Sequence, residues 1–333
     1  MKEPIPHAFP FDPRYGCNET ALRSIQAPDT SPPDFREFWQ DLYTEAQQVP
    51  LNLCVEEMTS PGPGLCLEKC TYTVWPGYRV SAWLLRPDNN KLPELGVVVG
   101  HGYGGREGPD PDRAGSDRAV LFPVAPGFHI SPDSRVPHND CQKHVIHGIQ
   151  SPRSYILAAC AAAFWRAVDV LEELFAGPLS HLHYIGWSFG GGVGALMLPW
   201  EPRYQSAELG QVTFADHPFR VRHDCVGSGA AVRELWLRHP EIEETLRYYD
   251  AANSLRHLHI PTAFACSQFD PAVPPPGQWA AANAHPGPKI ISPFPLGHFD
   301  LPYPAQDQAE REHQQRVTEF FGFPGIPSHS HRR

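Results

Sequence analysis

Apolar residues recur at two different spacings in the N-terminal part of the chain. After Ser31 they return every third or fourth position, which predicts an amphipathic helix with one aromatic face. Ser31 is the expected N-cap, and Pro32 lies in the first turn. The aromatic face consists of Phe35, Phe38, Trp39, Leu42 and Tyr43. Three strand-like runs follow at 51–57, 65–74 and 78–86. The dipeptide Pro76-Gly77, which is typical of tight turns, joins the last two runs.

The pattern changes after residue 95. Short, continuously apolar runs appear there, of the kind found in strands that are buried on both faces of a parallel sheet. They lie at 95–100, 117–123, 182–186, 211–215, 260–267 and 289–294. Helical stretches separate them, at 153–176, 189–199, 229–249 with a break at Pro240, 276–284 and 305–321. This alternation predicts an α/β protein with a mostly parallel central sheet, antiparallel N-terminal strands and helices on both faces.

Nothing in the composition marks a linker, so we expect one domain over residues 1–323. Residues 1–30 are rich in Pro, Asp and Asn and are predicted to form an extended N-terminal arm, and 324–333 a flexible tail. Proline contributes 38 of 333 residues, about 11% against an ordinary level of about 5%. So much proline favours long, stiff loops and argues against an all-helical bundle.

Charge and cysteine usage narrow the class of protein. With 27 basic and 37 acidic residues the formal charge is −10, which repels phosphate backbones and anionic lipid, so we expect neither nucleic acid nor a membrane as partner. The N-terminus lacks the apolar segment of a secretory signal. The eight cysteines and the histidine pairs lack metal-site spacing. We therefore expect a cytoplasmic protein with reduced cysteines, no metal and no cofactor.

One motif carries catalytic chemistry. Gly186-Trp187-Ser188-Phe189-Gly190 is the single G-x-S-x-G of the chain, and it lies between a strand-like run and a helical stretch. A strand, a sharp turn and a helix are what the nucleophile elbow of the α/β-hydrolase fold requires. Such an elbow presents the Ser188 hydroxyl beside the first N–H groups of a helix. The alternative is a glycine-rich turn with an ordinary serine. We predict an α/β-hydrolase fold with Ser188 as nucleophile.

A serine nucleophile needs a base, and the base needs an acid that orients it. In this fold both follow the serine along the chain, first the acid and then the histidine. His298 is the candidate base because it lies in a loop after the last predicted strand, whereas the other late histidines lie on helices or in the tail. Asp270 follows the strand at 260–267 and is the favoured acid; Asp216, after the run at 211–215, is the alternative.

The oxyanion of an ester intermediate needs two backbone N–H donors. In this fold one belongs to the residue after the serine, here Phe189, and the other to the loop after the strand at 95–100. That loop reads Gly-His-Gly-Tyr-Gly-Gly from residue 100, and we choose the Tyr103 amide, because flanking glycines let amides turn inward. The Trp187 side chain is expected either to line the substrate pocket or to pack in the core beside the elbow.

With these residues placed, the sequence resembles carbohydrate esterase family 7, the acetyl xylan esterases and cephalosporin C deacetylases. The resemblance rests on PPDFREFW, GHGYGG, HVIHGI, GWSFGGG, LRYYDAANSLRHLHIPT, SQFDPAVPPP and GPKIISPFPLGHF, spread between residues 32 and 299. It implies Ser188 as nucleophile, Asp270 as acid, His298 as base, and the Tyr103 and Phe189 amides as oxyanion donors. Members of this family are often hexameric rings, so the resemblance leaves room for a homo-oligomer.

Three positions depart from the family pattern. Phe189 stands where the family usually has Gln, 125–127 reads Ala-Pro-Gly in place of Arg-Gly-Gln, and Phe299 stands in place of Glu. Each change puts an apolar residue where the family has a polar one, so we expect Phe299 to line a more apolar substrate pocket.

The sequence therefore predicts a serine carboxylic-ester hydrolase whose partner is a small-molecule ester, acetyl esters first. Two alternatives remain at this point. One keeps the same residues for a more apolar substrate, as an esterase, lactonase or thioesterase. The other is a catalytically silent α/β-hydrolase that acts as a binding protein. A peptidase is the weaker alternative, since the chain is short for an added gating domain.

Overall fold

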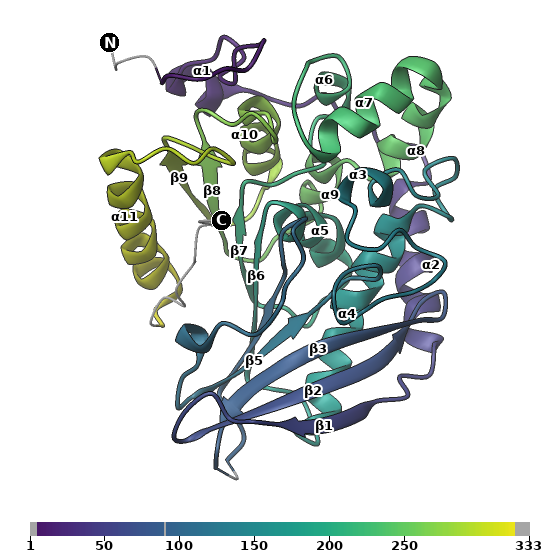
Figure 1. Ribbon diagram of the computed structural model, residues 1–333, viewed down its shortest axis with the longest axis vertical. Helices are drawn as coiled ribbons and strands as arrows, with labels where there is room; N and C mark the ends of the chain where they lie inside the picture. Colours follow the sequence, from purple (N-terminus) through teal and green to yellow (C-terminus); the bar gives the residue numbers. More distant parts are fainter. Residues whose placement is uncertain (1–4, 90, 324–333) are drawn as a thin grey trace.

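The computed structural model describes residues 5–89 and 91–323. Within them, nine strands form one sheet in the order β1-β2-β3-β5-β4-β6-β7-β8-β9 (Figure 1). The strands are β1 (Cys54–Met58), β2 (Leu65–Val74), β3 (Tyr78–Pro87), β4 (Leu95–Val99), β5 (Arg118–Pro123), β6 (His181–Trp187), β7 (Ser206–Gly210), β8 (Thr262–Ser267) and β9 (Lys289–Phe294). The pairs β1–β2, β2–β3 and β3–β5 are antiparallel and all others are parallel. The predicted sheet, antiparallel at its N-terminal side and parallel beyond, is confirmed.

Helices cover both faces of this sheet (Figure 1). They are α1 (Glu19–Ser24), α2 (Phe35–Gln48), α3 (Cys141–His144), α4 (Ile156–Leu174), α5 (Phe189–Met197), α6 (His217–Arg220), α7 (Ser228–Arg238), α8 (Glu243–Tyr248), α9 (Ala251–Leu255), α10 (Pro275–Ala284) and α11 (Pro304–Phe321), with short 3-10 turns at Pro111–Arg113, Leu198–Trp200 and Pro240–Ile242. One face carries α4 against β4 and β5, α5 against β6 and β7, and α10 against β8; α11 packs on the other, against β8 and β9.

Helix α4 lies at the centre of the core. It is apolar nearly all round and buried from its first residue to Val168. This composition is required because the helix packs against the sheet on one side and against α2 on the other. Its Trp165 ring meets Trp39 of α2 edge-on at 6.1 Å, and the Trp165 indole N–H donates to the carbonyl oxygen of Met197 at 2.9 Å. No helix of the described residues is both long and apolar enough to cross a membrane.

The prediction of a strand at 211–215 is wrong. The strand at this place in the sheet is β7, five residues earlier, with the buried Glu208 at its centre. Glu208 Oε1 accepts a hydrogen bond from the Trp187 indole N–H at 3.1 Å and lies 3.4 Å from His313 Nε2. The residues after β7 are apolar because they are buried as a loop at the end of the sheet, where Gln211 and Phe214 have positive φ angles of 45° and 65°. Burial alone therefore does not distinguish a strand from a packed loop.

Two N-terminal expectations also need correction. The helix expected to start after Ser31 begins at Phe35, with Asp34 at its N-cap. The arm expected to be extended over residues 1–30 contains helix α1, whose N-cap Asn18 accepts a hydrogen bond from the Ala21 amide at 2.9 Å. An Asn three residues before a free amide is a common capping arrangement. The tail at 324–333 lies outside the described residues.

Candidate active site

Ser188 occupies the sharp turn between β6 and α5. Its φ of 55° and ψ of −116° lie in a region that non-glycine residues seldom adopt. Two backbone hydrogen bonds of 2.9 Å hold this conformation, from the Ser188 amide to the Gly210 carbonyl and from the Gly192 amide to the Ser188 carbonyl. The turn has the backbone form that the motif predicts for a nucleophile elbow.

Glycines on both sides of the serine let three chain segments meet. A Cβ on Gly190 would lie 2.9 Å from the carbonyl oxygen of His101, and a Cβ on Gly186 would collide with the Gly190 carbonyl. The elbow, the start of α5 and the loop after β4 are therefore in direct backbone contact. This close approach brings the amide of residue 189 and the loop that carries Tyr103 to the same corner of the sheet.

The structure brings Ser188, His298 and Asp270 together in one hydrogen-bonded row. The Ser188 hydroxyl donates to His298 Nε2 at 2.8 Å, and His298 Nδ1 donates to Asp270 Oδ2 at 2.8 Å. The three residues come from the β6–α5 turn, the loop after β9 and the loop after β8. Parallel strands place these loops at one edge of the sheet. This is the geometry that a serine, a base and an orienting acid require.

The Asp270 carboxylate is fully buried and receives four hydrogen bonds. Its Oδ1 accepts from the Ala272 and Val273 amides at 2.9 Å each, and its Oδ2 accepts from Gln278 Nε2 at 2.9 Å and from His298. Gln278 is a residue that the sequence analysis missed. It lies on α10, eight positions after the carboxylate, and a glutamine inside a predicted helix gives no sign of such a role.

The environment of His298 sets its affinity for a proton. Burial lowers the pKa of this imidazole, but the attraction of the Asp270 carboxylate and their hydrogen bond raise it by more. The net pKa of His298 therefore lies above the ordinary value of a histidine. A base of this kind takes a proton from the serine more readily than a free imidazole does.

The two amides predicted for the oxyanion lie at chain positions that leave an N–H available. Phe189 is the first residue of α5, where a helix has no internal acceptor for its amide. Tyr103 is the second residue of a turn that the Gly105 amide closes onto the Gly102 carbonyl at 2.9 Å.

A buried histidine fixes this turn. His101 Nδ1 donates to the Gly102 carbonyl at 2.7 Å, and His101 Nε2 accepts from the Ala125 amide at 2.9 Å. Burial lowers the pKa of His101 to about 3, so the ring is neutral and its two nitrogens have fixed roles. The loop is thereby tied to residue 125, where the sequence departs from the family pattern.

The aromatic side chains beside Ser188 pack into the core. The Phe189 ring is fully buried and lies 4.3 Å from the Tyr103 ring, centroid to centroid. Trp187 contacts Phe294 and His313, on the face of the sheet that α11 covers. Of the two positions expected for the Trp187 side chain, pocket wall or core, these contacts are those of the core.

Asp216, the alternative acid, is used elsewhere. It is the N-cap of α6, where its carboxylate accepts from the Phe219 amide at 3.2 Å. Because His298 Nδ1 is bonded to Asp270, the geometry favours Asp270 as the orienting acid.

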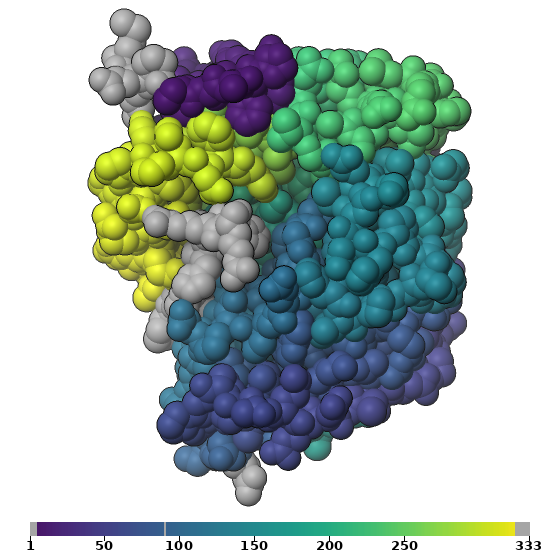
Figure 2. All heavy atoms as spheres, in the orientation of Figure 1, coloured from purple at the N-terminus to yellow at the C-terminus, as the bar shows by residue number. Residues whose placement is uncertain are grey.

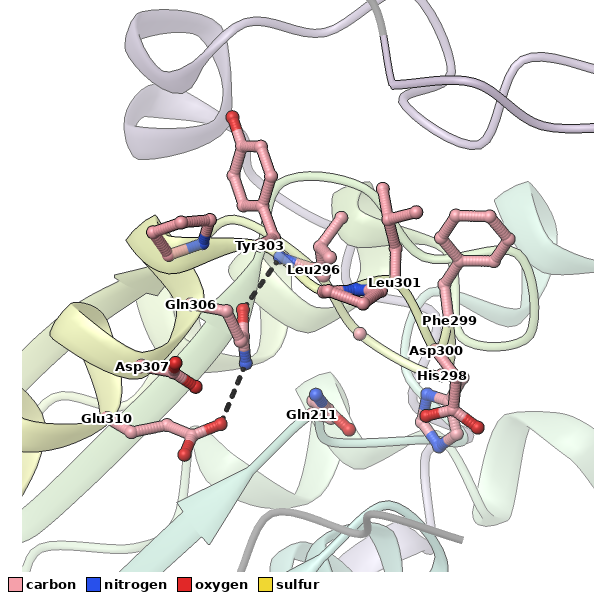
Figure 3. Close-up of a pocket in the computed structure, with 13 residues that line it drawn as sticks. Gln211, Leu296, His298, Phe299, Asp300, Leu301, Tyr303, Gln306, Asp307 and Glu310 are labelled. Carbon is pink, nitrogen blue, oxygen red and sulfur yellow. Dashed lines mark hydrogen bonds between the residues drawn. The ribbon is translucent and has the colours of Figure 1, made fainter.

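A cavity of about 490 Å³ opens beside His298, between the loop after β9 and the start of α11 (Figure 3). One side is apolar, with Leu296, Phe299 and Leu301, and Gln211 and His298 lie at the opposite side. Its volume is in the range of small-molecule sites. Phe299 lies in the wall of this cavity together with His298. That it lines the substrate pocket stays a prediction.

Comparisons with known proteins agree with this geometry. The family model described as acetyl xylan esterase (AXE1) matches residues 19–312. The chain belongs to the acetyl xylan esterase family. It is a carboxylic ester hydrolase with the α/β-hydrolase fold.

Solved structures of this family share the whole fold. An acetyl xylan esterase from Paenibacillus sp. R4 aligns with a TM-score of 0.80 and 22% identity, over 91% of this chain and 99% of that chain. Acetyl Xylan Esterase 1 from Thermoanaerobacterium sp. JW/SL YS485 aligns with a TM-score of 0.77 and 18% identity, over 91% and 98% of the two chains. The Pyrococcus horikoshii acylaminoacyl peptidase aligns with a TM-score of 0.55 and 9% identity. The alignment covers 88% of the present chain and 45% of the peptidase chain.

Proposed function

We propose that this protein is a serine acetylesterase that removes acetyl groups from small acetylated molecules through an acyl-enzyme. The observation that carries the proposal is the unbroken row of 2.8 Å hydrogen bonds from Ser188 through His298 to Asp270. Membership of the acetyl xylan esterase family supports acetyl as the acyl group.

In the first half of the reaction Ser188 Oγ attacks the ester carbonyl carbon, and its proton moves to His298 Nε2. The Asp270 carboxylate stabilises the imidazolium and keeps the imidazole in the required tautomer. The negative oxygen of the tetrahedral intermediate accepts hydrogen bonds from the Tyr103 and Phe189 amides. Collapse of the intermediate transfers the proton from His298 to the leaving alcohol and leaves acetyl on Ser188.

In the second half a water molecule takes the place of the alcohol. His298 Nε2 removes a proton from this water, the hydroxide attacks the acetyl carbonyl, and the same two amides hold the second oxyanion. The C–O bond to Ser188 then breaks, the serine oxygen regains its proton from His298, and acetate leaves.

A single variant tests the nucleophile. In Ser188→Ala we expect hydrolysis of p-nitrophenyl acetate to fall by roughly 10⁴-fold or more, and a fluorophosphonate probe to label the wild-type protein once and the variant not at all. Intact-protein mass spectrometry measures the label. Labelling that persists in the variant would remove Ser188 from this role, and a wild-type protein that takes no label would favour a silent, ligand-binding α/β-hydrolase.

The apolar wall of the cavity favours a second candidate, an esterase for longer or more apolar esters. Leu296, Phe299 and Leu301 line the cavity beside His298. A series of p-nitrophenyl esters from acetate to octanoate, measured beside acetylated xylose, separates the two candidates. Highest kcat/KM for the acetyl compounds supports the deacetylase, and a steady rise with chain length supports the second candidate.

A further inference from the structure

Residues 5–16, here called the arm, precede in sequence the segment that the family model matches, which begins at residue 19. Figure 2 shows these N-terminal residues, in dark purple, seated across one end of the molecule against the C-terminal segment in yellow and the α6–α8 region in green. A tight local turn shapes the arm. The Asp12 carboxylate accepts from the Arg14 and Gly16 amides at 2.9 and 3.0 Å, and Tyr15 has a φ of 52°.

The arm bonds directly to the loop that carries Asp270. The Asp270 amide donates to the Pro13 carbonyl at 3.1 Å, and Pro13 is buried. Two residues on, the Tyr15 hydroxyl donates to the Asp224 carbonyl at 2.8 Å. The 224–226 segment is itself joined to this loop, because the Val226 amide donates to the Pro271 carbonyl at 2.9 Å. The backbone at Asp270 is thus held by the arm, both directly and through the 224–226 segment.

The arm also packs on the loop that carries His298. Ile5 belongs to a small apolar cluster, separate from the main core, with Phe269 and Leu296 at its centre and Phe299 packed against it. The Phe9 ring meets the Phe299 ring edge-on, with centroids 5.7 Å apart. The residue after the base is therefore fixed by contact with the arm, in a cluster to which the main core does not contribute.

From these contacts we propose that residues 5–16 form a positioning arm that holds the loops of Asp270 and His298 in register with each other. The inference rests on the proposed function, because it gives these two residues their catalytic roles. Within the described residues the arm does not line the cavity. It acts from behind Phe299, so it sets the geometry of the acid and the base and does not bind substrate.

The first test removes one aromatic contact. Phe9→Ala is compared with Phe175→Ala, a half-buried phenylalanine that follows α4 at the opposite edge of the sheet. We expect kcat to fall about tenfold in Phe9→Ala with KM within about twofold, because a small misplacement of catalytic groups lowers turnover. Phe175→Ala leaves kcat within about twofold. Equal kcat values for the two variants would overturn the proposal.

The second test changes the turn and leaves the aromatic contacts in place. Asp12→Ala removes the acceptor of the Arg14 and Gly16 amides and lets the Pro13 carbonyl move, so we expect kcat to fall. Asp12→Asn keeps one side-chain oxygen, which can accept from the Arg14 amide, but its NH2 group cannot accept from the Gly16 amide. We expect its kcat to lie between those of Asp12→Ala and the wild-type protein. Identical losses in both variants would contradict a positioning role.

The pH profile gives a readout that general destabilisation does not move. The titratable groups around His298 are Asp270, Asp300 on its own loop, and Asp307 and Glu310 on α11 across the cavity. Asp270 is the group that raises the pKa of His298. If the arm loosens that pair, the pKa falls, and the acid limb of kcat/KM moves to lower pH in Phe9→Ala. An unmoved limb would count against the proposal.

A direct observation separates this proposal from the proposed function. The proton on His298 Nδ1 gives a strongly downfield NMR resonance while it is bonded to Asp270. We expect this resonance at the same position in the wild-type protein and in Phe175→Ala, and shifted upfield and broadened in Phe9→Ala. A protein that hydrolyses no ester but shows this pattern would lose the proposed function and keep the positioning arm. An active enzyme whose resonance and kcat are both unchanged in Phe9→Ala would keep the proposed function and overturn the positioning arm.

Discussion

Two regions of the active site, the elbow at Ser188 and the loops of Asp270 and His298, are held in place by different kinds of contact. The elbow at Ser188 is fixed by its own backbone, through two hydrogen bonds and through glycines that let the elbow contact the loop after β4. The loops of Asp270 and His298 are fixed by contacts from other elements, with Gln278 of α10 on the carboxylate, the Pro13 carbonyl on the Asp270 amide and Phe9 on Phe299.

This difference predicts how each region responds to change. The elbow bonds to Gly210 and contacts His101, which are distant in sequence, but the glycines that allow these contacts lie within one short motif, so the motif is sufficient to reveal it. The supports of the Asp270 and His298 loops carry no such motif, so they are visible only in the folded molecule. We expect substitutions at the elbow to lower kcat through steric collisions. Substitutions around the two loops should lower kcat through the loss of hydrogen bonds and packing.

The largest expected effect belongs to the acid. Asp270→Asn keeps the shape of the side chain but removes the charge that orients His298, and we expect kcat to fall by roughly 10⁴-fold. Asp216→Asn is the matched control, because an asparagine also caps α6 at this position. Steady-state kinetics with p-nitrophenyl acetate measures both variants. Comparable losses in the two would show that Asp216 contributes to catalysis.

The elbow is tested by adding one methyl group. In Gly190→Ala the new Cβ would lie 2.9 Å from the His101 carbonyl, so α5 and the oxyanion loop must separate. Loss of one oxyanion donor typically costs about 10²–10³ in kcat, and we expect a decrease of that size. Gly108→Ala, where the Cβ meets open space, is the control and should keep full activity. A fully active Gly190→Ala would show that the contact between the two segments is not required.

The elements that could be predicted from sequence are those with a local signal. The runs at 65–74 and 289–294 match β2 and β9 residue for residue. The G-x-S-x-G motif located the elbow, because the strand and the helix beside it carry their own hydrophobic patterns. His298 and Asp270 were found from their place after predicted strands, since a parallel sheet brings those chain positions to one edge.

The parts that could not be predicted depend on tertiary contacts. Strand β7 was misplaced because the buried Glu208 makes it look polar, while the loop after it is apolar. Gln278 was missed because a polar residue in a helix is ordinarily exposed. The bond from the Asp270 amide to Pro13 joins positions more than 250 residues apart, and no short motif marks such a contact.

A smaller effect tests the side-chain support of the acid. In Gln278→Leu the Asp270 Oδ2 atom loses the hydrogen bond from Gln278 Nε2. The Ser267 amide also loses its acceptor, because it donates to Gln278 Oε1 at 2.8 Å in the wild-type protein. We expect kcat to fall about tenfold and the free energy of unfolding to fall by about 1–3 kcal/mol. Gln268→Leu, two residues before the acid and bonded to Glu19, is the control for both measurements. Unchanged kcat in Gln278→Leu would limit this glutamine to a structural role.

The smallest effect separates the two regions by pH alone. Protonated His298 cannot accept the Ser188 proton, and its raised pKa keeps it protonated to higher pH than an ordinary histidine, so kcat/KM should fall on acidification from above the ordinary pKa of about 6.5. The oxyanion loop adds no second ionisation to this profile. The pKa of His101 is about 3, so its hydrogen bond from the Ala125 amide persists across this pH range. A plot of log kcat/KM against pH should therefore have an acid limb with a slope of one. A slope of two would show that a second group, in the oxyanion loop or beside the cavity, loses its required form together with His298.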